Sequence, residues 1–135
     1  MAFVLDASVA LAWCFPDEAN DYADTVLRRF VEDDAVVPAI WPLEVLNALF
    51  VGARRGRIRE HEIERAGRLL GNLAIDVDEP ILFRTFDTIR EVAQTTQLTA
   101  YDAAYVELAL RLRCALATTD AKLSASARAL GIDVL

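Results

Sequence analysis

Hydrophobic residues in this chain follow two patterns that alternate along its length. Short, continuous apolar runs are typical of strands buried on both faces of a parallel sheet. Five runs predict such strands, at residues 2–5, 35–38, 73–77, 114–118 and 132–135. Longer stretches between them carry apolar residues three and four positions apart, which is the spacing of helices. The alternation predicts an α/β fold in which helices cover both faces of a parallel sheet.

Several residues indicate where the predicted helices begin or end. Pro42 lies near the start of one helix, at a position where proline loses no needed hydrogen bond. Thr99 and Asp102 have the spacing of a relative of the capping box, ahead of a helix that we expect to reach about Arg113. Gly131 is expected to end the last helix as its C′ residue.

Two predicted helices differ in how their apolar residues are distributed. The stretch 43–51 is apolar on more than one face, so it is either fully buried or supplies a subunit interface. The stretch after Pro80 has the spacing of a stripe that faces the core. The members of this stripe are Ile81, Leu82, Phe86, Ile89, Val92 and Ala93.

Composition limits the class of protein. The 135 residues are expected to form one domain, residues 1–135, with a normal hydrophobic core. Apolar residues make up 55% of the chain and charged residues 26%, which is typical of globular rather than disordered proteins. No apolar run approaches the roughly 20 residues that cross a bilayer, and the start lacks the basic region of a signal peptide. We therefore expect a cytoplasmic protein with no membrane segment.

Cysteine, histidine and net charge exclude several kinds of chemistry. Cys14 and Cys114 form neither a disulfide framework nor a zinc pattern and are expected to be small buried hydrophobes. His61 is the only histidine and is expected to be solvated in the first turn of a helix, which argues against histidine acid/base catalysis. The net charge of −7 argues against binding nucleic acid through bulk electrostatics, but it does not exclude a nuclease.

Basic residues gather in one short stretch around Gly56. Two explanations remain open for this stretch. It is either the C-terminus of a helix, with a glycine cap and favourable contacts to the helix dipole, or a contact for phosphate or for a protein partner. The residues concerned are Arg54, Arg55, Arg57 and Arg59.

Four carboxylates lie where an α/β fold would bring them to one end of the sheet. Asp6 ends the first apolar run and Asp120 follows the run at 114–117, whereas Glu44 and Asp102 lie in the first turns of predicted helices. Ligand sites in such folds lie outside the carboxyl ends of the strands. Four like charges gathered there would repel one another unless a cation held them. Carboxylate oxygens suit Mg²⁺ or Mn²⁺, which can orient phosphate oxygens and activate water.

Each acid also has an ordinary explanation. Asp6 and Asp120 are suitable N-cap residues, Asp102 is suited to be the reciprocal acid of a cap, and Glu44 is a first-turn acid favoured by the helix dipole. Their joint arrangement at strand ends and helix starts nevertheless favours the metal site.

Polar side chains accompany these acids. Ser8 and Thr118 each lie two residues from an acid that follows a predicted strand, and Asn47 lies one helical turn after Glu44. We expect these three residues to support the carboxylates.

Four fragments of the chain, in this order and spacing, resemble the PIN domain and specifically the VapC-type toxins of bacterial toxin–antitoxin pairs. The fragments are Val4–Val9, Pro42–Asn47, Leu98–Tyr105 and Ala117–Leu123, and the resemblance covers nearly the whole chain. It implies a three-layer α/β/α domain with a five-stranded parallel sheet. It also implies an endoribonuclease that depends on Mg²⁺ or Mn²⁺ and acts as a toxin.

The resemblance assigns roles to individual positions. It implies that the metal-site acids are Asp6, Glu44, Asp102 and Asp120, supported by Ser8, Asn47 and Thr118. It further implies a homodimer, and inhibition by a small antitoxin that inserts a peptide into the active-site groove. An arginine from that peptide would suit the acidic cluster. Some relatives place a further acid where this chain has Ala121 and Lys122, which leaves open whether one metal or two are bound.

Other functions remain open at this stage. A PIN nuclease that processes RNA or cuts DNA would carry the same acids, because discrimination by the 2′-hydroxyl depends on the shape of the groove. A non-catalytic PIN-like binding module would use its apolar surface for assembly. A phosphoacceptor signalling domain also places acids at strand ends, but it requires an acidic pair near the first strand, an acceptor aspartate after a central strand and a lysine late in the fold, and the acids of this chain are spread differently.

Overall fold

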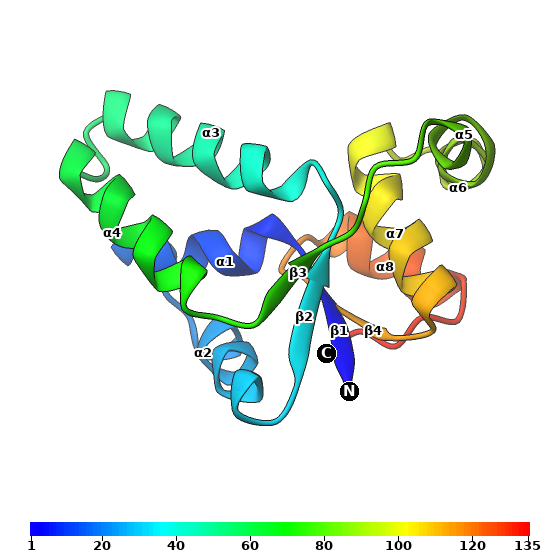
Figure 1. Cartoon of the computed structure of the whole chain (residues 1–135), viewed down its shortest axis with the longest axis horizontal. Helices are drawn as coiled ribbons and strands as arrows, with labels where there is room; N and C mark the ends of the chain where they lie inside the picture. The colour runs from blue at the N-terminus through cyan, green and yellow to red at the C-terminus, as the bar shows by residue number, and fades with distance from the viewer.

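The computed structural model describes residues 1–135 and contains one parallel sheet of four strands (Figure 1). The strands are β1 (Ala2–Leu5), β2 (Asp34–Val37), β3 (Ile75–Val77) and β4 (Ala115–Ala117). Their order in the sheet is β3-β2-β1-β4, so β1 is an inner strand between β2 and β4. The predicted α/β fold with a parallel sheet is confirmed, and each of the first four predicted strands is found within two residues of its expected bounds.

The expected fifth strand at 132–135 is wrong. Only Val134 forms a bridge, a parallel one to Leu116. Ile132 is not free to extend a strand, because its N–H donates to the carbonyl of Ala127 and completes the end of the last helix. The sheet therefore has four strands, with a single bridge beside β4.

The helices lie on both sides of this sheet. In Figure 1, α1 to α4 lie to one side of the strands and α5 to α8 to the other. None of them combines the length and the apolar composition needed to cross a bilayer. The bounds are α1 (Ala7–Cys14), α2 (Asp21–Arg28), α3 (Trp41–Arg54), α4 (Glu60–Gly71), α5 (Leu82–Arg84), α6 (Arg90–Thr96), α7 (Ala100–Leu112) and α8 (Ala121–Ala129). Short 3₁₀ turns cover Pro16–Glu18 and Arg29–Val31, and a π-turn covers Thr85–Ile89.

Most of the predicted helix boundaries are confirmed. Pro42 lies in the first turn of α3, and Thr99 caps α7 by accepting a hydrogen bond of 3.1 Å from the N–H of Asp102. Gly131 follows α8 with φ +81°, a conformation that glycine adopts without steric penalty. The two free cysteines are half-buried rather than fully buried.

The predicted core-facing stripe after Pro80 is only partly correct. Ile89, Val92 and Ala93 pack against the core, but Leu82 is 77% exposed and Phe86 is 68% exposed. The π-turn at 85–89 explains the difference, because its wider i to i+5 spacing changes which residues share a face: Leu82, before it, and Phe86, within it, face away from the side on which Val92 and Ala93 pack.

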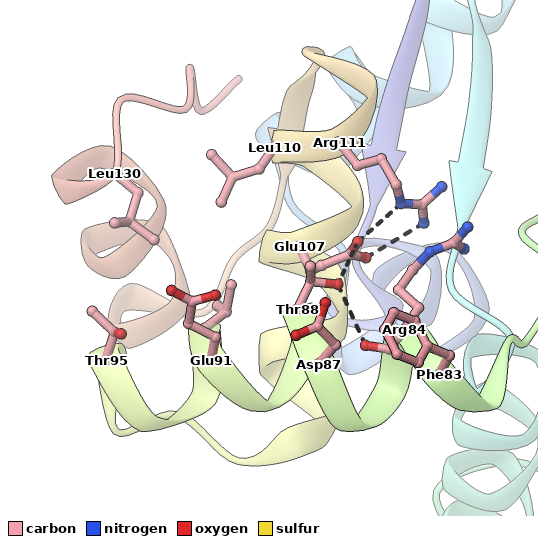
Figure 2. Close-up of a pocket in the computed structure, with 11 residues that line it drawn as sticks. Phe83, Arg84, Asp87, Thr88, Glu91, Thr95, Glu107, Leu110, Arg111 and Leu130 are labelled. Atoms are coloured by element: carbon pink, nitrogen blue, oxygen red, sulfur yellow. Dashed lines mark hydrogen bonds and ion pairs between the residues drawn. The ribbon is translucent and has the colours of Figure 1, made fainter.

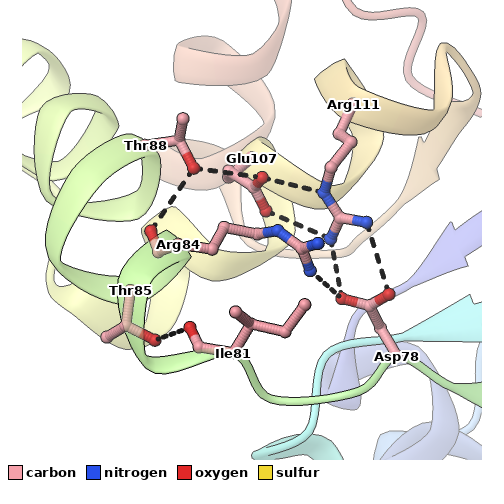
Figure 3. A network of polar contacts seen from close by, with 7 residues as sticks. All are labelled: Asp78, Ile81, Arg84, Thr85, Thr88, Glu107 and Arg111. Carbon is pink, nitrogen blue, oxygen red and sulfur yellow. Dashed lines mark hydrogen bonds and ion pairs between the residues drawn. The ribbon is translucent and has the colours of Figure 1, made fainter.

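An ion-pair network fastens this segment to α7 (Figure 3). Asp78, just after β3, accepts hydrogen bonds from Arg111 at 2.6 Å and from Arg84 at 3.4 Å. Arg111 also donates to Glu107 at 2.9 Å, and the Thr88 hydroxyl donates to the same carboxylate at 3.3 Å. The Glu107 side chain is only 6% exposed, so its charge is tolerated because these partners neutralise and hydrogen-bond it.

Candidate functional site at the carboxyl edge of the sheet

Asp6 is a buried carboxylate at the end of an inner strand. It follows β1 directly and is 7% exposed. Its Oδ2 accepts hydrogen bonds from Ser8 Oγ at 2.6 Å and from Thr118 Oγ1 at 2.7 Å. Asp6 occupies the N-cap position of α1, yet its side chain forms no capping hydrogen bond. The capping explanation is therefore wrong for this residue.

The same hydroxyls also hold the turn after β4. Ser8 Oγ accepts the N–H of Thr119 at 3.1 Å, and Thr118 Oγ1 accepts the N–H of Asp120 at 3.0 Å. The N–H of Thr118 donates to the hydroxyl of Tyr22 at 3.2 Å. Each hydroxyl thus donates to Asp6 while it accepts from the backbone, which fixes the direction of its proton. The structure brings Ser8 and Thr118 together at Asp6, as their sequence positions predicted.

Asp120 is the N-cap residue of α8, and Asp102 lies in the first turn of α7. Asp120 caps α8, because its Oδ1 accepts the N–H of Leu123 at 2.9 Å, and its Oδ2 has no hydrogen bond. Asp102 contributes its N–H to the Thr99 cap, but its carboxylate does not complete a capping box. One oxygen of Asp120 and both oxygens of Asp102 are therefore available to a ligand.

Glu44 is held by a residue that the sequence did not single out. It lies in the first turn of α3, and its Oε1 accepts a hydrogen bond of 2.7 Å from the hydroxyl of Tyr105 on α7. Tyr105 is fully buried and lies three residues after Asp102. Asn47, which was expected to support Glu44, is exposed and forms no hydrogen bond with it.

Electrostatic interactions show that the acids influence one another. Burial raises the pKa of Asp6, and the charge of Asp120 raises it further, whereas the hydroxyls of Ser8 and Thr118 oppose the rise. Burial is also the largest cause of the raised pKa of Glu44, and the charges of Asp6 and Asp102 add to it.

The pKa of Asp102 follows the same pattern. Burial raises it first, the charges of Asp6 and Asp120 raise it further, and Lys122 lowers it. Each of these carboxylates is thus less stable as an anion than it would be in water, and a cation among them would relieve the repulsion.

Whether these residues fit a metal ion depends on chemistry and on arrangement. In this arrangement no three side chains of histidine, cysteine, aspartate or glutamate gather closely enough to hold an ion together. A preformed four-carboxylate cage is therefore not observed. The donor chemistry fits a hard divalent cation, since Mg²⁺ is usually bound through one or two carboxylates and keeps several waters. The buried Asp6 and the unbonded carboxylate of Asp102 are the pair that fits this mode.

Arg57 has a structural role. Its guanidinium bonds Asp17 at 2.8 Å and also pairs with Glu18, and it lies over the ring of Phe15 at 4.0 Å from the ring centroid. These contacts fix the segment after α3 to the turn after α1. Arg57 is therefore engaged within the chain.

The other three arginines of the cluster are differently placed. Gly56 has φ +74°, which supports the interpretation of this stretch as a helix end. Arg54 and Arg55 are exposed and form no ion pair, and Arg59 is exposed at the N-cap of α4. Arg54 and Arg55 thus remain candidates for contact with phosphate or with a partner.

A cavity of about 630 Å³ lies elsewhere, between the α5–α6 segment and α7 (Figure 2). Its apolar walls are formed by Phe83, Leu110 and Leu130. The acids Asp87 and Glu91 also line it. None of the four site acids lines this cavity. It is therefore separate from the carboxylate site.

Comparisons with known proteins place this geometry in context. Residues 3–129 match the family model of the PIN domain. Ribonuclease VapC3 of Pyrobaculum aerophilum is 31% identical over 128 residues, which cover 92% of this chain and 93% of that protein. The crystal structure of PAE2754 from Pyrobaculum aerophilum has a TM-score of 0.73 and 26% identity, and covers 99% of this chain and 92% of that one.

A more distant structure shares the fold alone. It is a toxin–antitoxin complex from Klebsiella pneumoniae, with a TM-score of 0.65 and 19% identity over 90% of this chain and 89% of that chain.

Proposed function

This chain belongs to the PIN domain family, and we propose that it is an endoribonuclease that depends on Mg²⁺ or Mn²⁺ and acts in the cytoplasm as the toxin of a toxin–antitoxin pair. The observation that carries the proposal is the set of acids at the carboxyl edge of the sheet, where burial and neighbouring acids raise the pKa of Asp6, Glu44 and Asp102. The similarity to a ribonuclease over almost the full length of both chains supports the choice of RNA as substrate.

The proposed reaction is hydrolysis of an RNA phosphodiester. A divalent ion, when bound, polarises the scissile phosphate and lowers the pKa of water. Asp6 and Asp102 would hold the ion directly, and the free oxygen of Asp120 would add negative charge beside it. Ser8 and Thr118 would keep Oδ2 of Asp6 fixed through the hydrogen bonds that they already donate.

Glu44 would orient the attacking water and accept its proton. One of its oxygens is held by Tyr105, which leaves the other free for this task. Attack of the water oxygen on phosphorus, with departure of the 3′-oxygen, would leave a 5′-phosphate and a 3′-hydroxyl.

The proposed antitoxin is a small protein that inserts a peptide into the site. An arginine guanidinium among these acids would relieve the same repulsion as a metal ion. It is a permanent cation, and it can donate two parallel hydrogen bonds to one carboxylate. The structural likeness to a toxin–antitoxin complex is compatible with such a partner. A small open reading frame immediately upstream would favour a toxin over an RNA-processing enzyme.

A homodimer is proposed from the exposed apolar surface of α3. Leu43, Leu46 and Phe50 are 64%, 38% and 43% exposed and lie at i, i+3 and i+7, so they form one stripe, the α3 face. The opposite side of α3 is buried in the core through Val45 and Leu49. A helix that is apolar on two sides exposes a surface that a second copy of the chain can cover.

The proposal is tested by incubating the purified protein with cellular RNA and, separately, with single- and double-stranded DNA. Each reaction contains Mg²⁺, Mn²⁺ or EDTA. Cleavage of RNA that requires the ion and is lost in Asp102→Asn supports it. Asp24→Asn is the matched control, because Asp24 is an exposed first-turn acid on α2, and full activity is expected.

Three outcomes count against the proposal. Cleavage that continues in EDTA would contradict the proposed dependence on a metal ion. Preferential cleavage of DNA would contradict RNA as the substrate. A folded protein that binds no Mn²⁺ and cuts nothing favours the non-catalytic binding module.

A further inference from the structure

We propose that Tyr105 is a positioning residue of the carboxylate site: its hydroxyl holds Glu44 so that one carboxylate oxygen faces the reacting groups. The inference rests on the proposed nuclease function, and it extends the site beyond the acids and hydroxyls found at strand ends.

The first support is the geometry of the contact. The Tyr105 hydroxyl donates to Glu44 Oε1 at 2.7 Å, across 61 residues of sequence. The tyrosine side chain is fully buried, so water does not compete for the carboxylate on that side. A buried tyrosine hydroxyl needs a partner, and here the partner is an acid of the site rather than a backbone carbonyl.

The second support is the position of Tyr105 between elements that carry the acids. It lies one helical turn after Asp102, so the two side chains leave the same face of α7. Its hydroxyl joins α7, which carries Asp102, to α3, which carries Glu44.

The third support is the chemistry of the donor. A tyrosine hydroxyl, whose ordinary pKa is about 10, is protonated at neutral pH and donates to Glu44 as an uncharged group. A neutral donor fixes a carboxylate without neutralising it. An arginine or lysine in the same place would compete with the metal ion for the charge of Glu44. Among these acids, a phenol orients Glu44 and leaves its charge available.

A purely structural role makes a different prediction. If Tyr105 only fills the core, removal of its hydroxyl changes stability, and any effect on the site is independent of Glu44. If it positions Glu44, the two residues act as a unit and their effects are not additive.

The experiment is a double-mutant cycle of Tyr105→Phe and Glu44→Ala. Phenylalanine keeps the ring in the core and removes only the donor. We expect Tyr105→Phe to lower kcat by about 10- to 100-fold, because Glu44 is no longer held for orienting the water, with KM for RNA within about twofold. We also expect it to weaken Mn²⁺ binding about 10-fold, because the charge of Glu44 is no longer fixed beside the ion. In the Glu44→Ala background, Tyr105→Phe is expected to change neither quantity. Mn²⁺ affinity is measured from the paramagnetic resonance signal of the free ion.

Tyr101→Phe is the matched control, because Tyr101 lies on the same helix, is 61% exposed and forms no hydrogen bond. It is expected to leave both quantities unchanged. An equal loss from Tyr105→Phe in both backgrounds, or an unchanged Mn²⁺ affinity, overturns the inference. Thermal melting of every variant confirms that the losses are measured on folded protein. If the parent protein binds Mn²⁺ but cuts no RNA, the nuclease proposal fails, and the cycle in Mn²⁺ affinity still decides the role of Tyr105.

Discussion

Thr118 Oγ1 donates a 2.7 Å hydrogen bond to Asp6 Oδ2, although the two residues are 112 positions apart in the chain. The register of the sheet explains the contact, because Leu5 on β1 pairs with Ala117 on β4 and each polar residue is the next one along. Two hydroxyl donors do not offset the burial of the Asp6 carboxylate, whose pKa remains raised. A buried acid kept at the expense of stability is typical of a functional site.

Asp6→Asn is expected to separate stability from activity. The amide keeps the shape of the side chain and can bond the same hydroxyls, but it removes a buried charge that Asp120 repels. In EDTA we therefore expect a higher melting temperature than in the parent protein. Cleavage of RNA is expected to fall by about 100-fold or more, because a charged ligand is lost. A well-folded Asp6→Asn protein with full activity would falsify the site.

The effect of pH follows from the direction of the same pKa shift. The folded state raises the pKa of Asp6 above its ordinary value of 3.8, so the folded state binds the proton more tightly than the unfolded state. The contribution of Asp6 to stability is thus fully present below pH 3.8 and is lost as the pH rises through the folded pKa. Each pKa unit of the shift corresponds to about 1.4 kcal/mol.

The measurement compares the parent protein and Asp6→Asn by urea unfolding in EDTA. The advantage of the variant should be small near pH 4 and should grow towards pH 7. Saturating Mg²⁺ should reduce it, because the ion stabilises the anion. A difference in stability that stays constant across this pH range would show that the pKa of Asp6 is the same in the folded and unfolded states.

Arg111→Met is expected to destabilise the protein by about 3–5 kcal/mol, because it leaves the buried Glu107 carboxylate without its cation. The methionine keeps much of the side-chain volume, so the loss reports the missing charge. The additional change Glu107→Gln should restore part of the stability. Urea unfolding measures each variant.

Arg90→Met supplies the control for this prediction. Arg90 is exposed and bonds only within its own helical segment, to Phe86 and Gln94. Its replacement should change stability by at most about 0.5 kcal/mol. Similar losses of unfolding free energy for Arg90→Met and Arg111→Met would mean that the Arg111–Glu107 ion pair contributes no more to stability than an exposed contact.

The fold was largely predictable because buried parallel strands leave continuous apolar runs in the sequence. The errors have local causes. The last run could not become a strand because Ile132 completes the end of α8. Regular helical spacing predicts Leu82 and Phe86 in the core. They are exposed because a π-turn at 85–89, which no residue pattern announces, interrupts that spacing.

The sequence predicts the site residues that follow neighbouring strands. It does not predict those that meet only because two helices cross. Asp6, Ser8 and Thr118 meet because residues that follow neighbouring parallel strands lie at one edge. Tyr105 was missed, because a tyrosine at helical spacing reads as a core residue and its contact with Glu44 needs the crossing of α3 and α7.

The α3 face provides a test of assembly. Phe50→Asp places a charge within the exposed stripe of Leu43, Leu46 and Phe50, at the residue farthest along α3 from the site acid Glu44. We expect dimer dissociation to become at least about 100-fold easier, because a charge buried in an apolar interface without a partner loses several kcal/mol of binding. The fold of the monomer should be retained, because Phe50 is 43% exposed and is not part of the buried core. Sedimentation at several protein concentrations measures the dissociation constant.

Val31→Asp is the control for this change. Val31 is 87% exposed and lies in the 3₁₀ turn before β2, outside the α3 face. A loss of dimer in Phe50→Asp but not in Val31→Asp assigns the interface to α3. An equal loss in both would point to a general effect of added negative charge on a protein that already carries a net charge of −7. A parent protein that sediments as a monomer at high concentration excludes the homodimer, and the α3 face would then be the first surface on which to map the antitoxin.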